Sequence, residues 1–217
     1  MPRIALIHAT PLSMDPINAA FEQHWPEAQR MHVLDDSLSR DRERDAELTD
    51  AMVDRFITLA TYAKGTGADA ILFTCSAFGP AIEAAGRAVE IPTFKPNEAM
   101  FAEALRIGTR LALVATFRPS LVSMSDEIEA MANARDMRVD LRTVYVPGAM
   151  ADAAAGKPSD HDRKIAESAA PIKDADCVML AQFSMARAGA LVQQQLKCPV
   201  LTSPGCAVLG LRMALDA

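Results

Sequence analysis

Short apolar runs and longer amphipathic stretches alternate along the whole chain of 217 residues. The apolar runs predict strands at residues 3–7, 31–34, 70–73, 91–94, 111–115, 139–146, 177–180 and 200–201. Apolar residues at helical spacing predict helices at residues 17–25, 45–64, 80–89, 97–107, 121–134, 161–171, 186–196 and 207–215. The polar residues 35–44 and the irregular residues 147–159 are predicted to be loops. Strands that alternate with helices are typical of α/β proteins with mainly parallel sheets.

The second half of the chain repeats the first half at a fixed offset. Asp69 corresponds to Asp176 and Pro92 to Pro199, and the offset is 107 positions in both pairs. A chance match would not keep one register over about 90 residues, so the sequence predicts two pseudo-symmetric α/β lobes of Rossmann- or flavodoxin-like type. The predicted units are residues 1–96, residues 97–202 and a last helix, about 203–217, that packs back on the first lobe.

A cysteine follows one of the predicted buried strands. The polar triplet Thr74, Cys75 and Ser76 comes directly after the apolar residues 70–73, and a helix is predicted to begin soon after it. Open α/β sheets place their ligand crevices at such corners. The positive end of a helix can lower a cysteine pKa, and its N–H groups can bind a carboxylate or an oxyanion. Cys75 is therefore predicted to be the reactive residue, although a cysteine that only fills the end of the sheet is the alternative.

The repeat gives the cysteine a counterpart in the second lobe. Gln182 stands where Cys75 stands in the first lobe, so a pseudo-two-fold arrangement would place the two side chains across one cleft. Other polar residues at the strand ends could bind an anion, cap a helix or face solvent. The predicted substrate-binding residues are Thr10, Thr74, Ser76, Thr116, Gln182 and Ser184, with His8 as a candidate acid or base and Arg118 as a candidate partner for an anion.

Composition and charge exclude several classes of function. The net charge of −6 and the lack of a basic run argue against a nucleic acid as the main partner. The chain shows no apolar run long enough for a membrane span and no signal-peptide core, and its four cysteines match neither a metal site nor a disulfide framework, so a cytoplasmic protein with reduced thiols is expected. Glycine-rich nucleotide motifs and metal-binding motifs are absent, so no cofactor and no metal are expected.

Four segments of the chain match motifs of a known family, namely residues 5–11 (ALIHATP), 69–76 (DAILFTCS), 111–116 (LALVAT) and 176–185 (DCVMLAQFSM). They resemble the aspartate/glutamate racemase superfamily, which includes hydantoin and allantoin racemases, maleate isomerase and arylmalonate decarboxylase. The resemblance implies a cleft between two lobes, a small carboxylate or carbonyl substrate, no cofactor, and a homo-oligomer such as a dimer. Racemases of this superfamily place one cysteine at each corner, where one removes the proton alpha to a carboxylate or carbonyl and the other returns a proton from the opposite face.

By this resemblance Cys75 is the first-lobe cysteine, whereas Gln182 replaces the second. An amide cannot exchange a proton as a thiol does near neutral pH. Four functions stay open at this point. They are a racemase or isomerase that uses a different second acid, a decarboxylase that protonates its substrate on one side, a non-catalytic protein that binds small carboxylates, and a cysteine hydrolase in which His8 activates Cys75.

Overall fold

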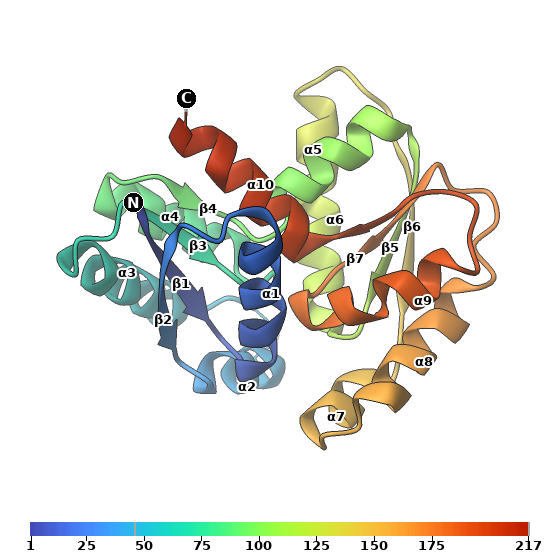
Figure 1. Ribbon diagram of the computed structural model, residues 1–217, viewed down its shortest axis with the longest axis horizontal. Coiled ribbons are helices and arrows are strands. Elements are labelled where there is room, and N and C mark those ends of the chain that lie inside the picture. Colours follow the sequence, from blue (N-terminus) through green and yellow to red (C-terminus); the bar gives the residue numbers. More distant parts are fainter. Residues whose placement is uncertain (46, 217) are drawn as a thin grey trace.

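Two lobes, each built on a four-stranded parallel sheet, make up the computed structural model, which describes residues 1–45 and 47–216 (Figure 1). The first sheet has the strand order β2-β1-β3-β4 and the second has β6-β5-β7-β8, which is the same topology and that of flavodoxin-like sheets. The predicted α/β class with two pseudo-symmetric lobes is confirmed. The strands are β1 (Arg3–His8), β2 (Gln29–Leu34), β3 (Ala70–Phe73), β4 (Thr93–Phe94), β5 (Arg110–Ala115), β6 (Asp140–Tyr145), β7 (Cys177–Leu180) and β8 (Val200–Thr202).

The repeat in the sequence reproduces individual hydrogen bonds. The carboxylate of Asp69 accepts a hydrogen bond from the backbone N–H of Arg3 at 2.7 Å. In the second lobe the carboxylate of Asp176 accepts one from the backbone N–H of Arg110 at 2.9 Å. Each aspartate therefore ties the start of one central strand to the segment before its neighbour, which explains why this residue type recurs at the same register.

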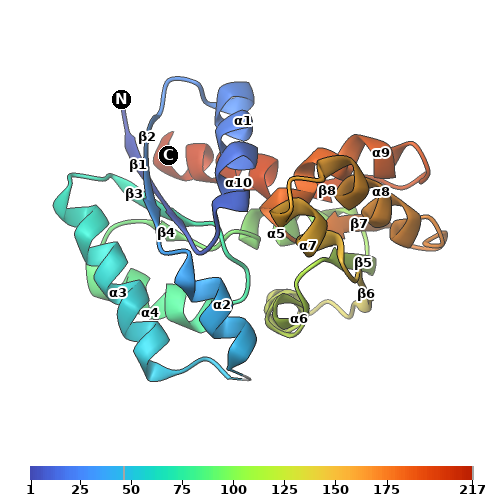
Figure 2. The ribbon, with the colours of Figure 1, turned by 90° about the horizontal axis from the view of Figure 1, so that it is seen from below.

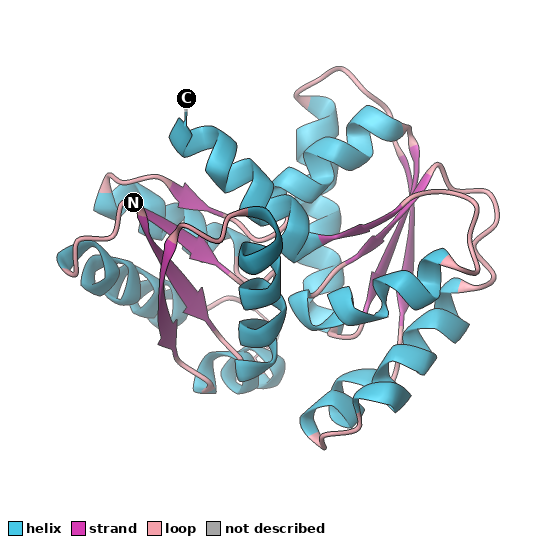
Figure 3. Ribbon diagram, in the orientation of Figure 1, coloured by secondary structure: helices cyan, strands magenta, loops and turns pink. Residues whose placement is uncertain are grey.

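Helices cover both faces of each sheet (Figure 3). In the first lobe the side chains of β1 alternate between two cores, one shared with α3 (Asp50–Gly65) and α4 (Gly79–Val89), the other with α1 (Met14–His24) and α10 (Ser203–Asp216). Figure 2 shows these two pairs of helices on opposite sides of the sheet. The C-terminal helix α10 thus returns from the second lobe and buries Val208 and Leu211 against the first.

One core also holds the second lobe together. The α-helices of the second lobe are α5 (Glu98–Ile107), α6 (Arg118–Asn133), α7 (Ala149–Ala154), α8 (Pro158–Ala169) and α9 (Gly189–Gln193). Each lobe also has a short 3-10 helix, η1 (Pro11–Ser13) in the first lobe and η2 (Phe183–Ala188) in the second. None of the helices within the described residues is long and apolar enough to cross a membrane.

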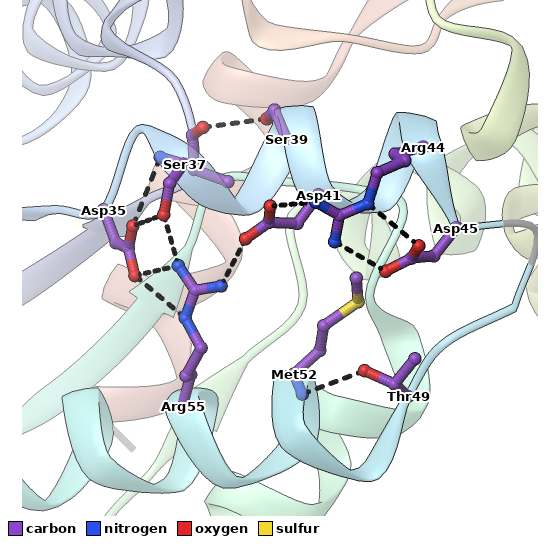
Figure 4. A network of polar contacts seen from close by, with 10 residues as sticks. Asp35, Ser37, Ser39, Asp41, Arg44, Asp45, Thr49, Met52 and Arg55 are labelled. Carbon is purple, nitrogen blue, oxygen red and sulfur yellow. Dashed lines mark hydrogen bonds and ion pairs between the residues drawn. The ribbon is translucent and has the colours of Figure 1, made fainter.

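The prediction of a loop at residues 35–44 was wrong, because these residues contain the helix α2 (Ser37–Arg44). Its sequence, SLSRDRER, carries too few apolar residues for an amphipathic signal. Ion pairs fix the helix instead: the guanidinium of Arg55, on α3, donates hydrogen bonds to Asp35, Ser37 and Asp41 (Figure 4). Tertiary contacts that come from another helix cannot be detected in the local pattern.

Several other elements also differ from the prediction in extent, and three of these differences are informative. Residues 147–159 contain α7, a short helix framed by Gly148 and Gly156 with φ values of 75° and 70°, and these glycines produced the loop signal. The helix predicted at 45–64 begins at Asp50, where Thr49 caps it. The helix predicted at 186–196 is split into η2 and α9. Ala46 and Ala217, which fall within two of the predicted helices, lie outside the described residues.

Candidate active site

A small cavity of about 40 Å³ lies between the two lobes, at the carboxyl ends of their central strands. Both lobes contribute to its wall, so the fold brings together residues that are more than 100 positions apart in the sequence. Seven of the predicted site residues line it, namely Thr10, Thr74, Cys75, Ser76, Thr116, Gln182 and Ser184. Of the other two candidates, His8 is buried behind this wall, and Arg118 lines a neighbouring cavity.

Burial controls the ionisation of Cys75. It raises the pKa of the thiol to about 11, although the backbone N–H of Ala77, the hydroxyl of Ser39 and the positive charge of Arg42 all favour the thiolate. The expectation that a helix terminus would lower this pKa was therefore wrong. Cys75 precedes the first residue of α4, Gly79, by four positions, so desolvation outweighs the helix dipole at this distance. Near neutral pH the substrate-free protein holds a protonated thiol, which is a proton donor.

In the second lobe Gln182 is held by its own lobe. Its carboxamide oxygen accepts hydrogen bonds from the backbone N–H of Thr116 at 2.7 Å and from the Thr116 hydroxyl at 3.1 Å. Its carboxamide nitrogen donates to the hydroxyl oxygen of Ser120 at 2.6 Å. The amide thus joins the end of β7 to Thr116, directly after β5, and to the first turn of α6. Both donors of Thr116 point at Gln182, so the predicted roles of Thr116 and Gln182 in substrate binding stay predictions.

His8 has partners other than the thiol. It is fully buried, and its Nδ1 atom lies 2.8 Å from the hydroxyl of Thr74 and 2.9 Å from that of Ser13. Its Nε2 atom lies 2.9 Å from Nδ1 of His32. Burial, together with His32, lowers the pKa of His8 to about 4. Both ring nitrogens are occupied by these three residues, so the Cys75–His8 pair that a cysteine hydrolase requires is not formed here.

A larger cavity of about 750 Å³ adjoins the small one, and Thr116, Phe117 and Met150 belong to the walls of both. The guanidinium of Arg118 lines this outer cavity and lies 4.5 Å from the centre of the Tyr145 ring, in a cation–π contact. The charged residues Arg42, Glu43 and Asp45 line it as well. Both cavities together therefore place the Cys75 thiol in a small space that adjoins a wide cavity with charged walls.

Several wall residues were missed by the sequence predictions. Ser39 and Arg42 come from α2 and Met150 from α7, the two helices that were predicted to be loops. These helices follow β2 and β6, which are equivalent strands in the two lobes. Phe117 and Met150 also pack against the core of the first lobe and so close the small cavity. The repeat did not reveal them, because the equivalent segment was predicted to be a loop in both lobes.

Within residues 1–45 and 47–216, no group of three or more His, Cys, Asp or Glu side chains is arranged so that it could hold a metal ion. The thiol, hydroxyl and amide groups of the small cavity are instead the chemistry that this site can offer.

The sequence family described as Asp/Glu/hydantoin racemase matches residues 7–212. The chain belongs to this family. No curated protein sequence matches the chain. The predicted superfamily is thus confirmed. Its members include racemases and a decarboxylase, so the chain belongs to a family of enzymes.

Solved structures of the family share this fold. Glutamate racemase isoform RacE1 from Bacillus anthracis superposes with a TM-score of 0.78 at 13% identity, over 99% of this chain and 82% of that chain. Allantoin racemase from Klebsiella pneumoniae gives 0.73 at 16% identity, over 100% and 89%. A variant of arylmalonate decarboxylase gives 0.64 at 20% identity, over 100% and 94%. The TM-scores establish a common two-lobed fold. The sequence identities are too low to assign a reaction, which has to be argued from the site.

Proposed function

We propose that the protein is a cofactor-independent enzyme that transfers a proton to one face of a small carboxylate substrate, with Cys75 as the proton donor. The observation that carries this proposal is a single thiol in the interlobe cavity, opposite an amide that is bound to its own lobe. A racemase needs a proton donor on each face of the reacting carbon, whereas this cavity offers one ionisable thiol. Protonation from one side is therefore the reaction that the cavity supports best.

A protonated thiol cannot remove a proton from the substrate, so the carbanion that Cys75 protonates must be formed by the loss of another group. Loss of carbon dioxide from a malonate-type substrate leaves an electron pair on the alpha carbon, which is delocalised into the remaining carboxylate. The Cys75 S–H bond breaks, its proton forms the new C–H bond, and the thiolate takes a proton from water to restore the enzyme. A thiol with a pKa of about 11 is protonated at neutral pH, so it is ready for this step.

The size of the cavities sets where the substrate would lie. A space of about 40 Å³ holds little more than one water molecule. The outer cavity is large enough for the rest of a small organic acid, and Met150 and Phe117 stand between the two spaces. We infer that the Met150 side chain moves when substrate binds, so that the reacting carbon reaches Cys75 while Arg118 faces an anionic group in the outer cavity.

The test is a screen of malonates, amino acids, hydantoins and maleate in deuterated water, followed by NMR. One-sided protonation places one deuterium on a single face of the product, whereas racemisation exchanges the proton and inverts the centre. The Cys75→Ser variant should lose activity by about 100-fold or more. Cys198→Ser is the matched control, because Cys198 is half-buried in the second lobe and outside the cavity. Full activity of Cys75→Ser would remove the thiol from the mechanism.

A non-catalytic protein that binds small carboxylates is the second candidate. The raised pKa of Cys75 favours it, because a binding protein has no need of a thiolate. This alternative predicts that carboxylates bind to wild type and to Cys75→Ser with the same affinity in calorimetry, and that no compound in the screen is turned over. Turnover that depends on Cys75 decides against it.

A further inference from the structure

A chain of hydrogen bonds runs from the interlobe cavity through the first lobe to the surface beside α1 and β2. It begins at the hydroxyls of Ser13 and Thr74, which line the small cavity and lie 2.9 Å apart. Both hydroxyls contact Nδ1 of His8. The Nε2 atom of His8 meets Nδ1 of His32 at 2.9 Å, and Nε2 of His32 lies 3.2 Å from the side-chain oxygen of Asn18. The path therefore crosses from the edge of the cavity to the surface formed by β2 and α1.

The geometry of the two imidazole rings suits proton transfer. Their planes are nearly parallel, at 15°, and their centroids are 5.1 Å apart. With a nitrogen–nitrogen distance of only 2.9 Å, this separation means that the rings meet edge to edge, with the N–H bond in line. This is the alignment that a hydrogen bond between the rings favours, and a proton can pass along the same line.

The hydrogen bonds of this chain all point in the same direction. The Asn18 oxygen is an acceptor, so the proton of neutral His32 is on Nε2 and its Nδ1 accepts. His8 then donates from Nε2 and accepts at Nδ1. The Ser13 hydroxyl has a backbone carbonyl as acceptor at 3.0 Å, whereas the carbonyl next to the Thr74 hydroxyl lies at 3.4 Å, so Thr74 is the better donor to His8 at 2.8 Å. A uniform direction of this kind is what a proton shift along the chain requires.

The surroundings keep both rings neutral. His8 has no exposed surface, and burial together with His32 lowers its pKa. Burial and the nearby Arg30 lower the pKa of His32, which opens onto a surface hollow that Asp15 and Glu22 also line. Because a charged imidazole is disfavoured at both positions, a proton crosses by a concerted shift between neutral tautomers.

We propose that Thr74, His8 and His32 conduct protons between the interlobe cavity and solvent in the surface hollow beside α1 and β2. In the outward shift a group in the cavity gives a proton to the Thr74 oxygen, Thr74 gives its own to Nδ1 of His8, His8 passes its Nε2 proton to Nδ1 of His32, and His32 releases its Nε2 proton to water. Each atom that gains a proton loses one, so one proton crosses. The inward shift is the reverse of these steps.

The path would serve the reaction proposed above and, in that use, rests on it. A thiolate left at Cys75 after protonation of a substrate lies in a cavity of about 40 Å³, where bulk water has little access. An inward shift returns a proton to this cavity without opening it. Asn18 allows both directions, because rotation of its amide presents either the oxygen or the NH₂ group to His32.

The path can be tested without any substrate. NMR on ¹⁵N-labelled protein measures how fast the ring N–H of His8 exchanges with water. We expect exchange to slow by about tenfold in His32→Gln, which keeps a hydrogen-bonding group but cannot relay a proton. Backbone amides of Leu6 and Ile7, on the same strand, should exchange as in wild type. Added imidazole should restore the exchange rate in His32→Ala, and His24→Gln, which changes a half-buried histidine off the path, should have no effect.

An unchanged rate in His32→Gln would overturn the path. So would a rate that rises together with that of the β1 amides, because the ring would then exchange through opening of the lobe. Once a substrate is known, His32→Gln should lower kcat and leave KM unchanged, and imidazole should rescue kcat in His32→Ala. Failure of the exchange test leaves the role of Cys75 untouched, and a lack of turnover leaves the exchange test valid, so the two proposals fail separately.

Discussion

The carboxamide oxygen of Gln182 lies 2.7 Å from the backbone nitrogen of Thr116, at the position that corresponds to the thiol of Cys75 in the first lobe. One lobe thus offers an ionisable group to the cavity, and the other uses the same position to join two of its own strands. The site is asymmetric although the fold is symmetric, which is why the proposed reaction acts on one face of the substrate.

Gln182 should contribute to stability. Gln182→Ala removes the acceptor of both Thr116 donors and the donor to Ser120, and groups left without a partner in a half-buried site should cost about 1–3 kcal/mol. Urea unfolding measures this loss. In a double-mutant cycle with Ser120→Ala, the sum of the stability losses in the two single variants should exceed the loss in the double variant, because both single substitutions remove the same hydrogen bond. Strict additivity would show that the 2.6 Å contact contributes nothing to stability.

Gln182→Cys should change the stereochemistry of the reaction. A thiol at this position stands across the cavity from Cys75 and can protonate the opposite face of the substrate. In deuterated water we expect a mixture of two products, each with one deuterium, added to one face in some molecules and to the opposite face in the others, whereas wild type labels one face only. Gln182→Ser is the matched control, since it frees Thr116 in the same way without adding a thiol. Label on a single face in Gln182→Cys would place the second wall too far from the substrate.

The ionisation of Cys75 can be followed directly. The ultraviolet absorbance of the thiolate, taken as the difference between wild type and Cys75→Ser, should appear around pH 11 instead of near the ordinary value of 9.0. Between these two values the folded protein binds the thiol proton and the unfolded chain does not. Stability from this group is therefore complete below pH 9.0 and is lost as the pH rises toward 11. A transition near neutral pH would contradict the burial argument.

Arg118 should affect substrate binding more than chemistry. Its guanidinium lines the outer cavity and is held over Tyr145, away from the thiol. Arg118→Ala should raise KM for an anionic substrate by about tenfold, because a charge-assisted contact is lost, while kcat stays within a factor of about two. Arg135→Ala, which removes an exposed arginine just beyond the carboxyl end of the same helix, is the control and should change neither. An equal fall in kcat would place Arg118 at the reacting atoms.

Most of the fold could be predicted because the information is local and repeated. Buried strands such as β3 and β7 are continuous apolar runs, and the recurring Asp69 and Asp176 fix the register of the two lobes. The location of Cys75 at a strand end also followed from the pattern. Its pKa did not, because desolvation depends on the segments that fold over the thiol. Ser39, from the helix that was predicted to be a loop, is one of the groups in contact with it.

The Arg55 contacts should hold that helix, and thus part of the site, in place. Arg55 on α3 pairs with Asp35, which precedes α2, and with Asp41, which lies within it (Figure 4). Ser39 of the same helix lines the Cys75 cavity. Arg55→Met keeps much of the side-chain volume but removes the charge and all donors. We expect a loss of about 1 kcal/mol in unfolding free energy, since the pair is partly exposed to solvent. Hydrogen exchange should rise in α2 and stay unchanged in α4, and turnover should fall because Ser39 is displaced. Equal protection of α2 in both proteins would show that Leu38, which is buried, suffices to hold the helix.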